Sequence, residues 1–362
     1  MTQLGGAERV AGFIAEMLPE ARLLTSVHRE SEVPVALIGG RAWQTSFLQP
    51  FAGRVPLKAM LPLLPRAIAS LDAGDSETVI STSSAFAHHA RPVAGARHVC
   101  YCSAPAHFLW NGEEYFRARP RLRAVLAPLL GRLRRLDLAA ARRVDTYVAN
   151  SQYTAQRIDA VYGRRSRVIY PPVDTSRLSP TRERSGRFVV VSRLVATKRI
   201  ELAVEAANRF ELGLDVIGSG PELERLRRLA GPTVGVHGWL PDDVVRRAMA
   251  ESTAVVIPGI EDFGIVTAEA QASGRPPVAF AAGGALEIVE DGATGFLFQE
   301  QTPEAAGAAM LRARDHALAT TDLLASAARF DAAIFAEALG RIIAGSSHGD
   351  ESSPVTVSEA AG

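Results

Sequence analysis

The chain has 362 residues, of which 47% are apolar and 22% charged, and its formal net charge is +1. This length predicts two domains, because single hydrophobic cores stop growing at roughly 250 to 300 residues. The near-zero charge gives no overall field that would recruit nucleic acid. The sequence shows neither a run of roughly 20 uncharged apolar residues nor a signal-peptide pattern, so we expect a cytoplasmic protein.

The first half alternates between short apolar runs and amphipathic stretches. Such alternation predicts a parallel sheet with helices on both faces. Cys100 and Cys102 lie two residues apart in one expected strand, a spacing that does not suit a structural disulfide, so we expect two reduced thiols. Ser151 is expected to open a helix. The expected strands are 35–38, 78–81, 99–102 and 145–149, with a helix at 60–71 and a long helical stretch before the last strand.

The start of the chain resembles a loop rather than a strand. Gly5 and Gly6 look like the turn that follows the first strand of a doubly wound sheet, yet only four residues precede them. We therefore expect the first strand of this sheet to be missing from the chain as given.

A proline pair separates the two halves. Pro171 and Pro172 disfavour helix and favour an extended connector. We predict an N-terminal Rossmann-like domain at 1–170, a linker at 171–186, a C-terminal Rossmann-like domain at 187–345 and a disordered polar tail at 346–362.

The second half alternates more regularly than the first and predicts a doubly wound α/β domain of its own. Its expected strands are 188–192, 214–218, 234–237, 254–257, 278–280 and 296–298, and its expected helices are 200–210, 221–230, 241–250, 265–273 and 285–290.

Glu261 and Glu269 flank the segment Asp-Phe-Gly-Ile-Val-Thr-Ala between an expected buried strand and a short helix. Ligands of open α/β sheets bind at the carboxyl ends of the strands, and free N–H groups at a helix start suit phosphate or sugar oxygens. Glu269, one turn further on, suits the diol of a ribose. Alternatively, the first acid complements the helix dipole and the second is an exposed helical glutamate.

Two cations follow the first strand of the second half. Positive charge at a helix N-terminus is disfavoured by the macrodipole, so Lys198 and Arg199 there indicate a need for an anion. Arg193 and Lys198 suit a diphosphate and the charge that builds on it as a leaving group. The alternative is a pair of solvated surface cations.

Further patterns are less specific. The glycines at 218 and 220 resemble a dinucleotide-binding fingerprint, but Leu223 occupies the position of its third glycine. We therefore interpret this segment as a tight turn near a nucleotide. Gly283-Gly284 offers either a backbone concavity or a plain turn. The histidines share no ligand-like spacing and no Asp-x-Asp pair is present, so we expect no metal and no cofactor.

Arginines and leucines alternate through Arg117–Arg143 with helical spacing. A basic amphipathic helix of this kind can contact an anionic membrane surface, which would suit a lipid-linked acceptor. The alternative is a solvated charged face.

In their order and spacing, these segments resemble retaining glycosyltransferases of family 4, which have the two-domain GT-B fold. Within that family, the sequence of these segments is most similar to that of bacterial mannosyltransferases that use GDP-mannose. The segments that carry the resemblance are 5–10, 100–110, 150–151, 169–174, 191–194, 198–200, 216–223, 258–269 and 283–287.

The resemblance implies a metal-free retaining hexosyltransferase, with a glycan or lipid-linked acceptor in surface polysaccharide or glycolipid synthesis. It assigns Arg193 and Lys198 to the diphosphate, Glu261 to the transferred sugar and Glu269 to the ribose. The other implied residues are Gly5, Gly6, Gly218, His237, Gly238, Phe263, Gly264, Ile265 and Val266 toward the donor and Ser103, His107 and Trp110 toward the sugar and acceptor.

Relatives usually carry His at the position of Ser103. That departure and the short N-terminus also fit a catalytically weak sugar-nucleotide-binding protein. The sequence is compatible as well with a UDP-sugar-dependent transferase of the same family. It is further compatible with a GT-B sugar-nucleotide epimerase, which would release a changed nucleotide sugar without an acceptor.

Overall fold

The computed structural model describes residues 5–31, 33, 35–116 and 120–345. The tail predicted to be disordered, 346–362, lies outside the described residues. So do residues 1–4, where a first strand is expected to be missing, and the first residues of the arginine-rich stretch, 117–119.

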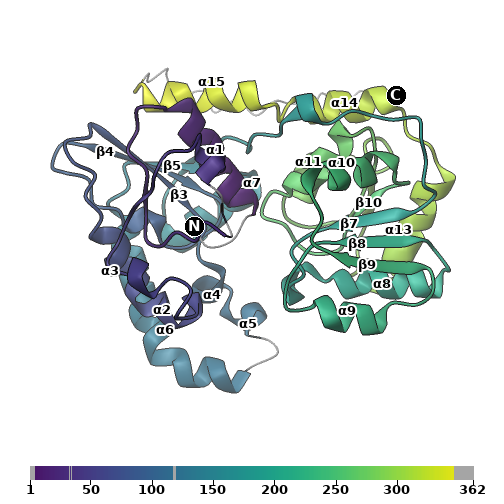
Figure 1. The fold of residues 1–362 in the computed structure, drawn as a ribbon, viewed down its shortest axis with the longest axis horizontal. Coiled ribbons are helices and arrows are strands. Elements are labelled where there is room, and N and C mark those ends of the chain that lie inside the picture. Colours follow the sequence, from purple (N-terminus) through teal and green to yellow (C-terminus); the bar gives the residue numbers. More distant parts are fainter. Residues whose placement is uncertain (1–4, 32, 34, 117–119, 346–362) are drawn as a thin grey trace.

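The N-terminal half contains a four-stranded parallel sheet in the order β3-β4-β5-β6 (Figure 1). Its strands are β3 (Thr78–Ser83), β4 (Arg97–Cys102), β5 (Thr146–Ala149) and β6 (Ser166–Val168). A separate parallel pair, β1 (Leu24–Thr25) and β2 (Gln44–Thr45), lies beside it. Three of the four strands expected from the sequence are therefore present.

Side chains of β4 alternate between two buried faces. Val99 and Tyr101 pack in a cluster with α1 (Gly6–Met17), whereas Cys100 and Cys102 pack with α6 (Pro120–Ala141) and α7 (Gln152–Tyr162). The period of two along a strand explains this division. Both cysteines are free and buried, as predicted.

Two predicted elements of this half differ in the structure. Residues 35–38 form a 3₁₀ helix, η1 (Val35–Ile38), rather than a strand. A run of four apolar residues does not by its periodicity distinguish a strand from a helical turn. The single helix predicted at 60–71 is broken into α2 (Leu57–Met60), η3 (Leu61–Leu63) and α3 (Leu64–Ala69), because Pro62 and Pro65 interrupt it.

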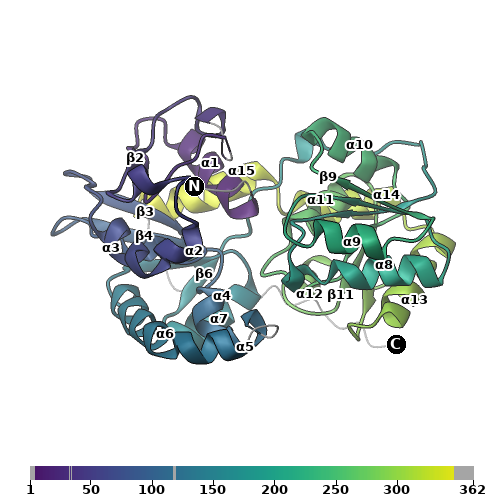
Figure 2. The same cartoon turned by 60° about the horizontal axis from the view of Figure 1, so that its bottom comes forward.

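The C-terminal half contains a six-stranded parallel sheet with helices on both faces, and every strand and helix predicted for it is present (Figure 2). The strands are β7 (Phe188–Val191), β8 (Leu214–Ile217), β9 (Val234–Gly238), β10 (Val255–Ile257), β11 (Pro277–Phe280) and β12 (Phe296–Phe298), and the helices are α8 (Ile200–Arg209), α9 (Leu223–Leu229), α10 (Asp242–Glu251), α11 (Ile265–Ala272) and α12 (Ala285–Ile288).

The strand order β12-β11-β10-β7-β8-β9 reverses between β7 and β10. The chain proceeds from β7 toward β9 on one side and from β10 toward β12 on the other. Loops that leave neighbouring strands at such a reversal diverge, and ligands bind in the crevice between them. The loops after β7 and β10 are therefore the place to look for a site.

The last helices join the two domains. After α13 (Pro303–Asp315) and α14 (Thr320–Ala328), α15 (Ala332–Ile343) runs back along the N-terminal domain (Figure 1). Its Phe335 and Leu339 are buried in one cluster with Tyr101 of β4. The predicted C-terminal range 187–345 thus includes a helix whose apolar face packs on the other domain.

The remaining short helices are connectors: η2 (Gln49–Phe51), η4 (Ala87–His89), α4 (His107–Trp110), α5 (Gly112–Tyr115), η5 (Thr175–Arg177) and η6 (Ala196–Lys198).

Candidate active site

Lys198 and Glu261 form an ion pair at the strand-order reversal. Lys198 ends η6 in the loop after β7, and Glu261 lies in the loop after β10. The Lys198 ammonium contacts a Glu261 carboxylate oxygen, and both side chains are largely sheltered, with 19% and 24% of their surface exposed. Two side chains predicted as catalytic from separate motifs therefore meet in one place.

The backbone at Glu261 is fixed by the glycine pair that follows β11. The Gly284 amide donates to the Glu261 carbonyl over 2.9 Å. A Cβ atom at Gly283 would lie 2.3 Å from that same carbonyl oxygen, and one at Gly284 would lie 2.1 Å from the Phe263 carbonyl oxygen. The pair is thus required for close approach of two loops.

The N-terminus of α11 provides free amides next to Glu261. Gly264 is the N-cap residue, and the Thr267 amide donates to its carbonyl over 2.9 Å. The amides of Ile265 and Val266 belong to the first turn, where no intrahelical acceptor exists, so they suit an anion. Phe263 can contribute only its backbone here, because its side chain is buried against Tyr170 and Phe330.

The start of α1 in the N-terminal domain faces the start of α11. A Cβ atom at Gly6 would lie 2.9 Å from Cδ1 of Ile265, so the two helix N-termini approach closely. Arg9, one turn later, lies 3.6 Å from a carboxylate oxygen of Glu269. Burial raises the pKa of Glu269, and the charge of Arg9 opposes this effect. Glu269 thus lies at the boundary between the domains, and its role toward the ribose stays a prediction.

Arg193 lies in the same loop as Lys198 and is exposed. Burial raises the pKa of Glu8 on α1, and backbone hydrogen bonds and the charge of Arg193 oppose that rise. Gly218 lets the turn after β8 pack against this loop, since a Cβ atom there would lie 1.8 Å from the Ser192 carbonyl oxygen. Glu8 was not singled out from the sequence.

His237 is occupied by a different contact. Its Nε2 lies 2.7 Å from Asp215, which also accepts a hydrogen bond of 2.6 Å from Arg187. Burial favours the protonated Asp215 carboxyl, but hydrogen bonds from Arg187 and His237 hold its pKa below the usual value. Next in the chain, the Gly238 carbonyl accepts from the Gly218 amide over 2.7 Å. The backbone here borders the predicted donor loops, whereas the imidazole belongs to this ion-pair network.

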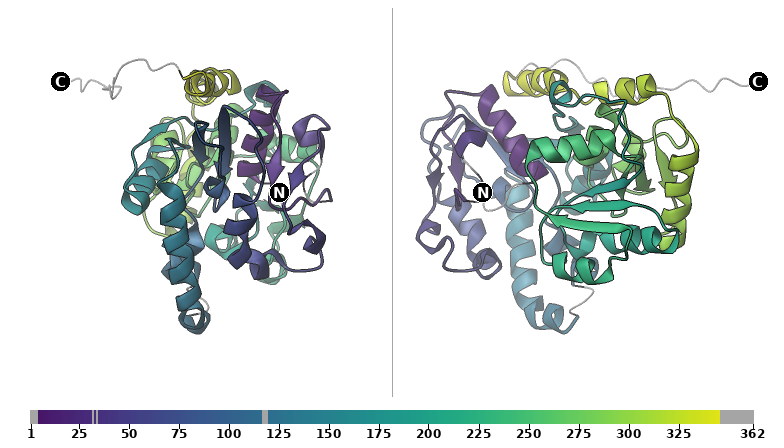
Figure 3. Two further views of the ribbon diagram at one scale, coloured as in Figure 1. Left: turned by 90° about the vertical axis from the view of Figure 1, so that its left-hand side faces the viewer. Right: turned by 45° about the vertical axis from the view of Figure 1, so that its right-hand side comes forward.

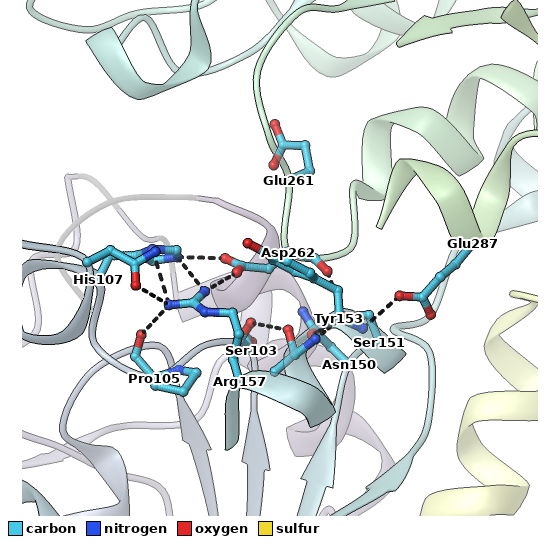
Figure 4. Close-up of polar contacts among 12 residues, drawn as sticks. Ser103, Pro105, His107, Asn150, Ser151, Tyr153, Arg157, Glu261, Asp262 and Glu287 are labelled. Carbon is cyan, nitrogen blue, oxygen red and sulfur yellow. Dashed lines mark hydrogen bonds and ion pairs between the residues drawn. The ribbon is translucent and has the colours of Figure 1, made fainter. Parts of the chain in front are cut away.

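Asp262, which follows Glu261 in the C-terminal domain, contacts side chains of the N-terminal domain (Figure 4). His107 of α4 contacts one Asp262 carboxylate oxygen over 2.8 Å, and Arg157 of α7 contacts the other over 2.5 Å. Figure 4 also shows Glu261 directed away from this cluster. His107 was expected on the sugar and acceptor side, whereas Asp262 and Arg157 were not expected at the site. Asp262 is adjacent to a predicted site residue, whereas no local pattern marks Arg157.

A second contact of this kind caps α7. The Glu287 carboxylate of α12 accepts hydrogen bonds from the amides of Gln152 and Tyr153 over 2.8 and 2.9 Å. Ser151 is the N-cap residue of α7, as predicted, and its hydroxyl also donates to the Asp262 carbonyl over 2.6 Å. The C-terminal domain thus accepts hydrogen bonds from backbone N–H groups at the start of a helix in the N-terminal domain.

The other two residues predicted on the acceptor side have different positions. Ser103 is half-buried at the end of β4, where its carbonyl accepts from Thr154 over 3.3 Å. Trp110 donates its indole N–H to Asp137 over 2.8 Å, and Asp137 is fully buried in the N-terminal domain. The indole N–H is therefore engaged inside this domain, and the role of Trp110 toward the sugar stays a prediction.

The expectation that no metal is bound stays a prediction, but three potential ligands do come together. The fold brings His88, His89 and Asp137 together in the N-terminal domain, with one ligand atom of each within 4.8 Å of the others. Sequence spacing did not reveal this group, because Asp137 lies on a distant helix.

The Asp262 cluster predicts a pH-dependent stability. Burial favours the protonated carboxyl, but the hydrogen bond from His107 and the charges of His107, Arg157 and Lys198 hold the pKa of Asp262 below its usual value. A carboxyl with a lowered folded-state pKa stabilises the fold above its unfolded pKa of about 3.9, and this contribution is lost as the pH falls through the folded-state value.

We therefore expect Asp262→Asn to lower the free energy of unfolding by roughly 1 to 2 kcal/mol at pH 7. The difference from the unsubstituted protein should persist to about pH 5 and shrink below about pH 4. Urea unfolding at several pH values measures it, with Asp75→Asn as the exposed control. A difference that is the same at pH 7 and below pH 4 would contradict this role of the carboxylate.

Two Rossmann-like domains with parallel sheets, joined by a helix that returns to the first, are the architecture of the GT-B glycosyltransferases. Residues 4–177 match the family model described as Glycosyltransferase Family 4, and residues 185–316 match the one described as Glycosyl transferases group 1. Together these two glycosyltransferase models span most of the chain, and the fold is GT-B.

Curated relatives match part of the chain. A D-inositol 3-phosphate glycosyltransferase of Geodermatophilus obscurus is 33% identical over 225 residues, which are 53% of this chain and 49% of the relative. A glycogen synthase of Xanthomonas euvesicatoria is 38% identical over 135 residues, 34% of this chain and 26% of the relative. The chain thus spans about half or less of the length of these relatives.

Solved structures match nearly the whole chain. Anabaena Alr3699/HepE in complex with UDP-glucose has a TM-score of 0.70 at 19% identity, covering 95% of this chain and 97% of that one. The lipopolysaccharide outer core galactosyltransferase WaaB has a TM-score of 0.66 at 17% identity, with the same coverage of both chains. At these identities the likeness establishes the fold.

Proposed function

We propose that this protein transfers a sugar from a nucleoside diphosphate sugar to a glycan or lipid-linked acceptor, with retention of anomeric configuration. The observation that carries the proposal is the contact between Lys198 and Glu261 at the strand-order reversal, beside the free amides that begin α11. A cation, a carboxylate and helix amides around one crevice match a diphosphate joined to a hydroxyl-rich sugar.

In this proposal Lys198 and Arg193 bind the diphosphate and neutralise the charge that develops as it leaves. Glu261 accepts hydrogen bonds from hydroxyls of the transferred sugar. Glu269 accepts from the ribose, a role that requires Arg9 to share or release its carboxylate. The nucleoside diphosphate then departs on the face from which the acceptor hydroxyl attacks, so stabilising the leaving group is the main catalytic contribution.

GDP-mannose is the donor that the sequence resemblance favours. A UDP-sugar is the second candidate, because Alr3699/HepE, which has the same fold, is described in complex with UDP-glucose. Both donors present a diphosphate and a sugar to the same side chains. The two donors differ in their nucleobase, and we propose that the backbone at Gly238 lies at the edge of the base-binding region.

We further propose that α6 provides peripheral contact with an anionic membrane. Among the described residues, no helix has the length and apolarity that a membrane span requires. On α6, Val125 is 76% exposed and Leu122 is 40% exposed, with the exposed Arg121 beside them. Figure 3 shows this helix extending beyond the rest of its domain. Co-flotation with phosphatidylglycerol vesicles, weakened by Val125→Glu and absent with phosphatidylcholine vesicles, is the expected result.

A panel of nucleotide sugars tests the transferase proposal. Binding at 100 times Kd should stabilise the fold by about 2.7 kcal/mol, so thermal unfolding with GDP-mannose, UDP-glucose and the free nucleotides identifies the donor. Mass spectrometry with the preferred donor and candidate acceptors should then detect a glycosylated product. Stabilisation by none of the nucleotide sugars, or release of a changed nucleotide sugar without acceptor, would overturn the proposal.

A further inference from the structure

A compact group of potential metal ligands lies inside the N-terminal domain, apart from the site described above. His88 and His89 lie on η4, which follows β3, and Asp137 lies on α6. All three are buried, with 1%, 4% and 0% of their surface exposed. Nε2 of His88 lies 3.0 Å from Oδ1 of Asp137, and Nε2 of His89 lies 3.6 Å from the same oxygen.

The three atoms that face one another have no hydrogen-bond partner among the described residues: His88 Nε2, His89 Nε2 and Asp137 Oδ1. The two short distances therefore lack the alignment of hydrogen bonds. A buried polar atom without a partner costs about 1 to 3 kcal/mol, so three such atoms in one place require an explanation.

The outward-facing atoms of the same side chains are held in place. Oδ2 of Asp137 accepts hydrogen bonds from the Trp110 indole over 2.8 Å and from the Tyr162 hydroxyl over 2.9 Å. Nδ1 of His88 lies 3.3 Å from the Ser83 hydroxyl. Metal sites have this pattern, in which outer partners orient each ligand and leave its other atom free for the ion.

We propose that His88, His89 and Asp137 bind a divalent first-row transition metal ion, with zinc as the expected occupant. Ligand atoms about 2.0 to 2.2 Å from a tetrahedral zinc ion lie roughly 3.3 to 3.5 Å from one another, so the two distances to Oδ1 bracket the required spacing. Two imidazole nitrogens and a carboxylate oxygen are among the ligand types that zinc favours.

The ion would be structural. It would join η4, which follows β3, to the C-terminal part of α6. Lys198 and Glu261 belong to the other domain, so the ion takes no part in the proposed transfer, and its test is independent of transferase activity.

Metal content tests the proposal directly. The protein is purified with a histidine-free affinity tag from zinc-supplemented culture, dialysed against metal-free buffer and analysed by inductively coupled plasma mass spectrometry. We expect close to one zinc per chain and a loss of thermal stability when the ion is removed by a chelator. His89→Gln should reduce zinc at least tenfold, whereas His98→Gln, which alters another buried histidine of this domain, should leave the content unchanged.

Cobalt provides a second readout that does not depend on any variant. Metal-free protein titrated with Co²⁺ should develop visible absorption that saturates near one equivalent and disappears when Zn²⁺ is added. Absence of bound metal in the unsubstituted protein together with absence of this absorption would overturn the proposal and leave a buried cluster of His–Asp contacts. Unchanged zinc in folded His89→Gln would also overturn it.

Discussion

Lys198→Ala is expected to lower kcat/KM for sugar transfer roughly 30- to 900-fold, which corresponds to about 2 to 4 kcal/mol of transition-state stabilisation. Negative charge develops on the departing diphosphate, and Lys198 is the sheltered cation at the reversal point between β7 and β10. Most of the loss should appear in kcat, because the interaction strengthens as the leaving group departs. Initial rates over a range of donor concentrations separate the two parameters.

Arg199→Ala is the matched control for this substitution. Arg199 is the adjacent cation, but it is engaged by Glu201 over 2.7 Å and by Gln301 over 3.2 Å. We expect its removal to leave kcat/KM within about threefold of the unsubstituted enzyme. A cation that is exposed or already paired adds little to the stabilisation of charge on the departing diphosphate. Equal losses in the two variants would point to a general electrostatic effect rather than a specific role of Lys198.

Glu261→Ala is expected to lower kcat/KM about 100-fold or more. A carboxylate that accepts hydrogen bonds from sugar hydroxyls contributes roughly 1.5 to 3 kcal/mol for each bond, and Glu261 has two oxygens available. The kcat/KM of Glu261→Gln should lie between that of the unsubstituted enzyme and that of Glu261→Ala, because the amide keeps one acceptor but loses the charge. The fold should persist in both, since the position of this loop is set by its backbone contact with Gly284 and not by the carboxylate.

Circular dichroism, urea unfolding and the same kinetic assay measure these effects together. Glu290→Ala, an exposed carboxylate of the same domain, should behave like the unsubstituted protein. Unchanged turnover in folded Glu261→Ala would remove Glu261 from the site. A loss of activity that only follows a loss of stability would assign the residue a structural role.

Local patterns were sufficient for most of the C-terminal domain. Its strands are short apolar runs separated by helices and glycine turns, and both signals depend on residues within a few positions of one another. The same locality placed Glu261 and Lys198 at strand ends. Their direct contact followed from the rule that the ends of parallel strands share one edge of a sheet. In the N-terminal half, the prediction of a strand at 35–38 was wrong, because four residues are too few to show a period.

Only the tertiary structure decided which distant side chains meet. Asp262 contacts Arg157 and His107 across the domain boundary, α15 returns to the N-terminal sheet, and Trp110 turns inward to Asp137 beside two histidines. The sequence by itself determined the two-domain architecture and placed Lys198 and Glu261 in the loops after β7 and β10. It did not determine these contacts, because each joins residues far apart in the chain, and their meeting depends on how whole helices pack rather than on any periodicity along one segment.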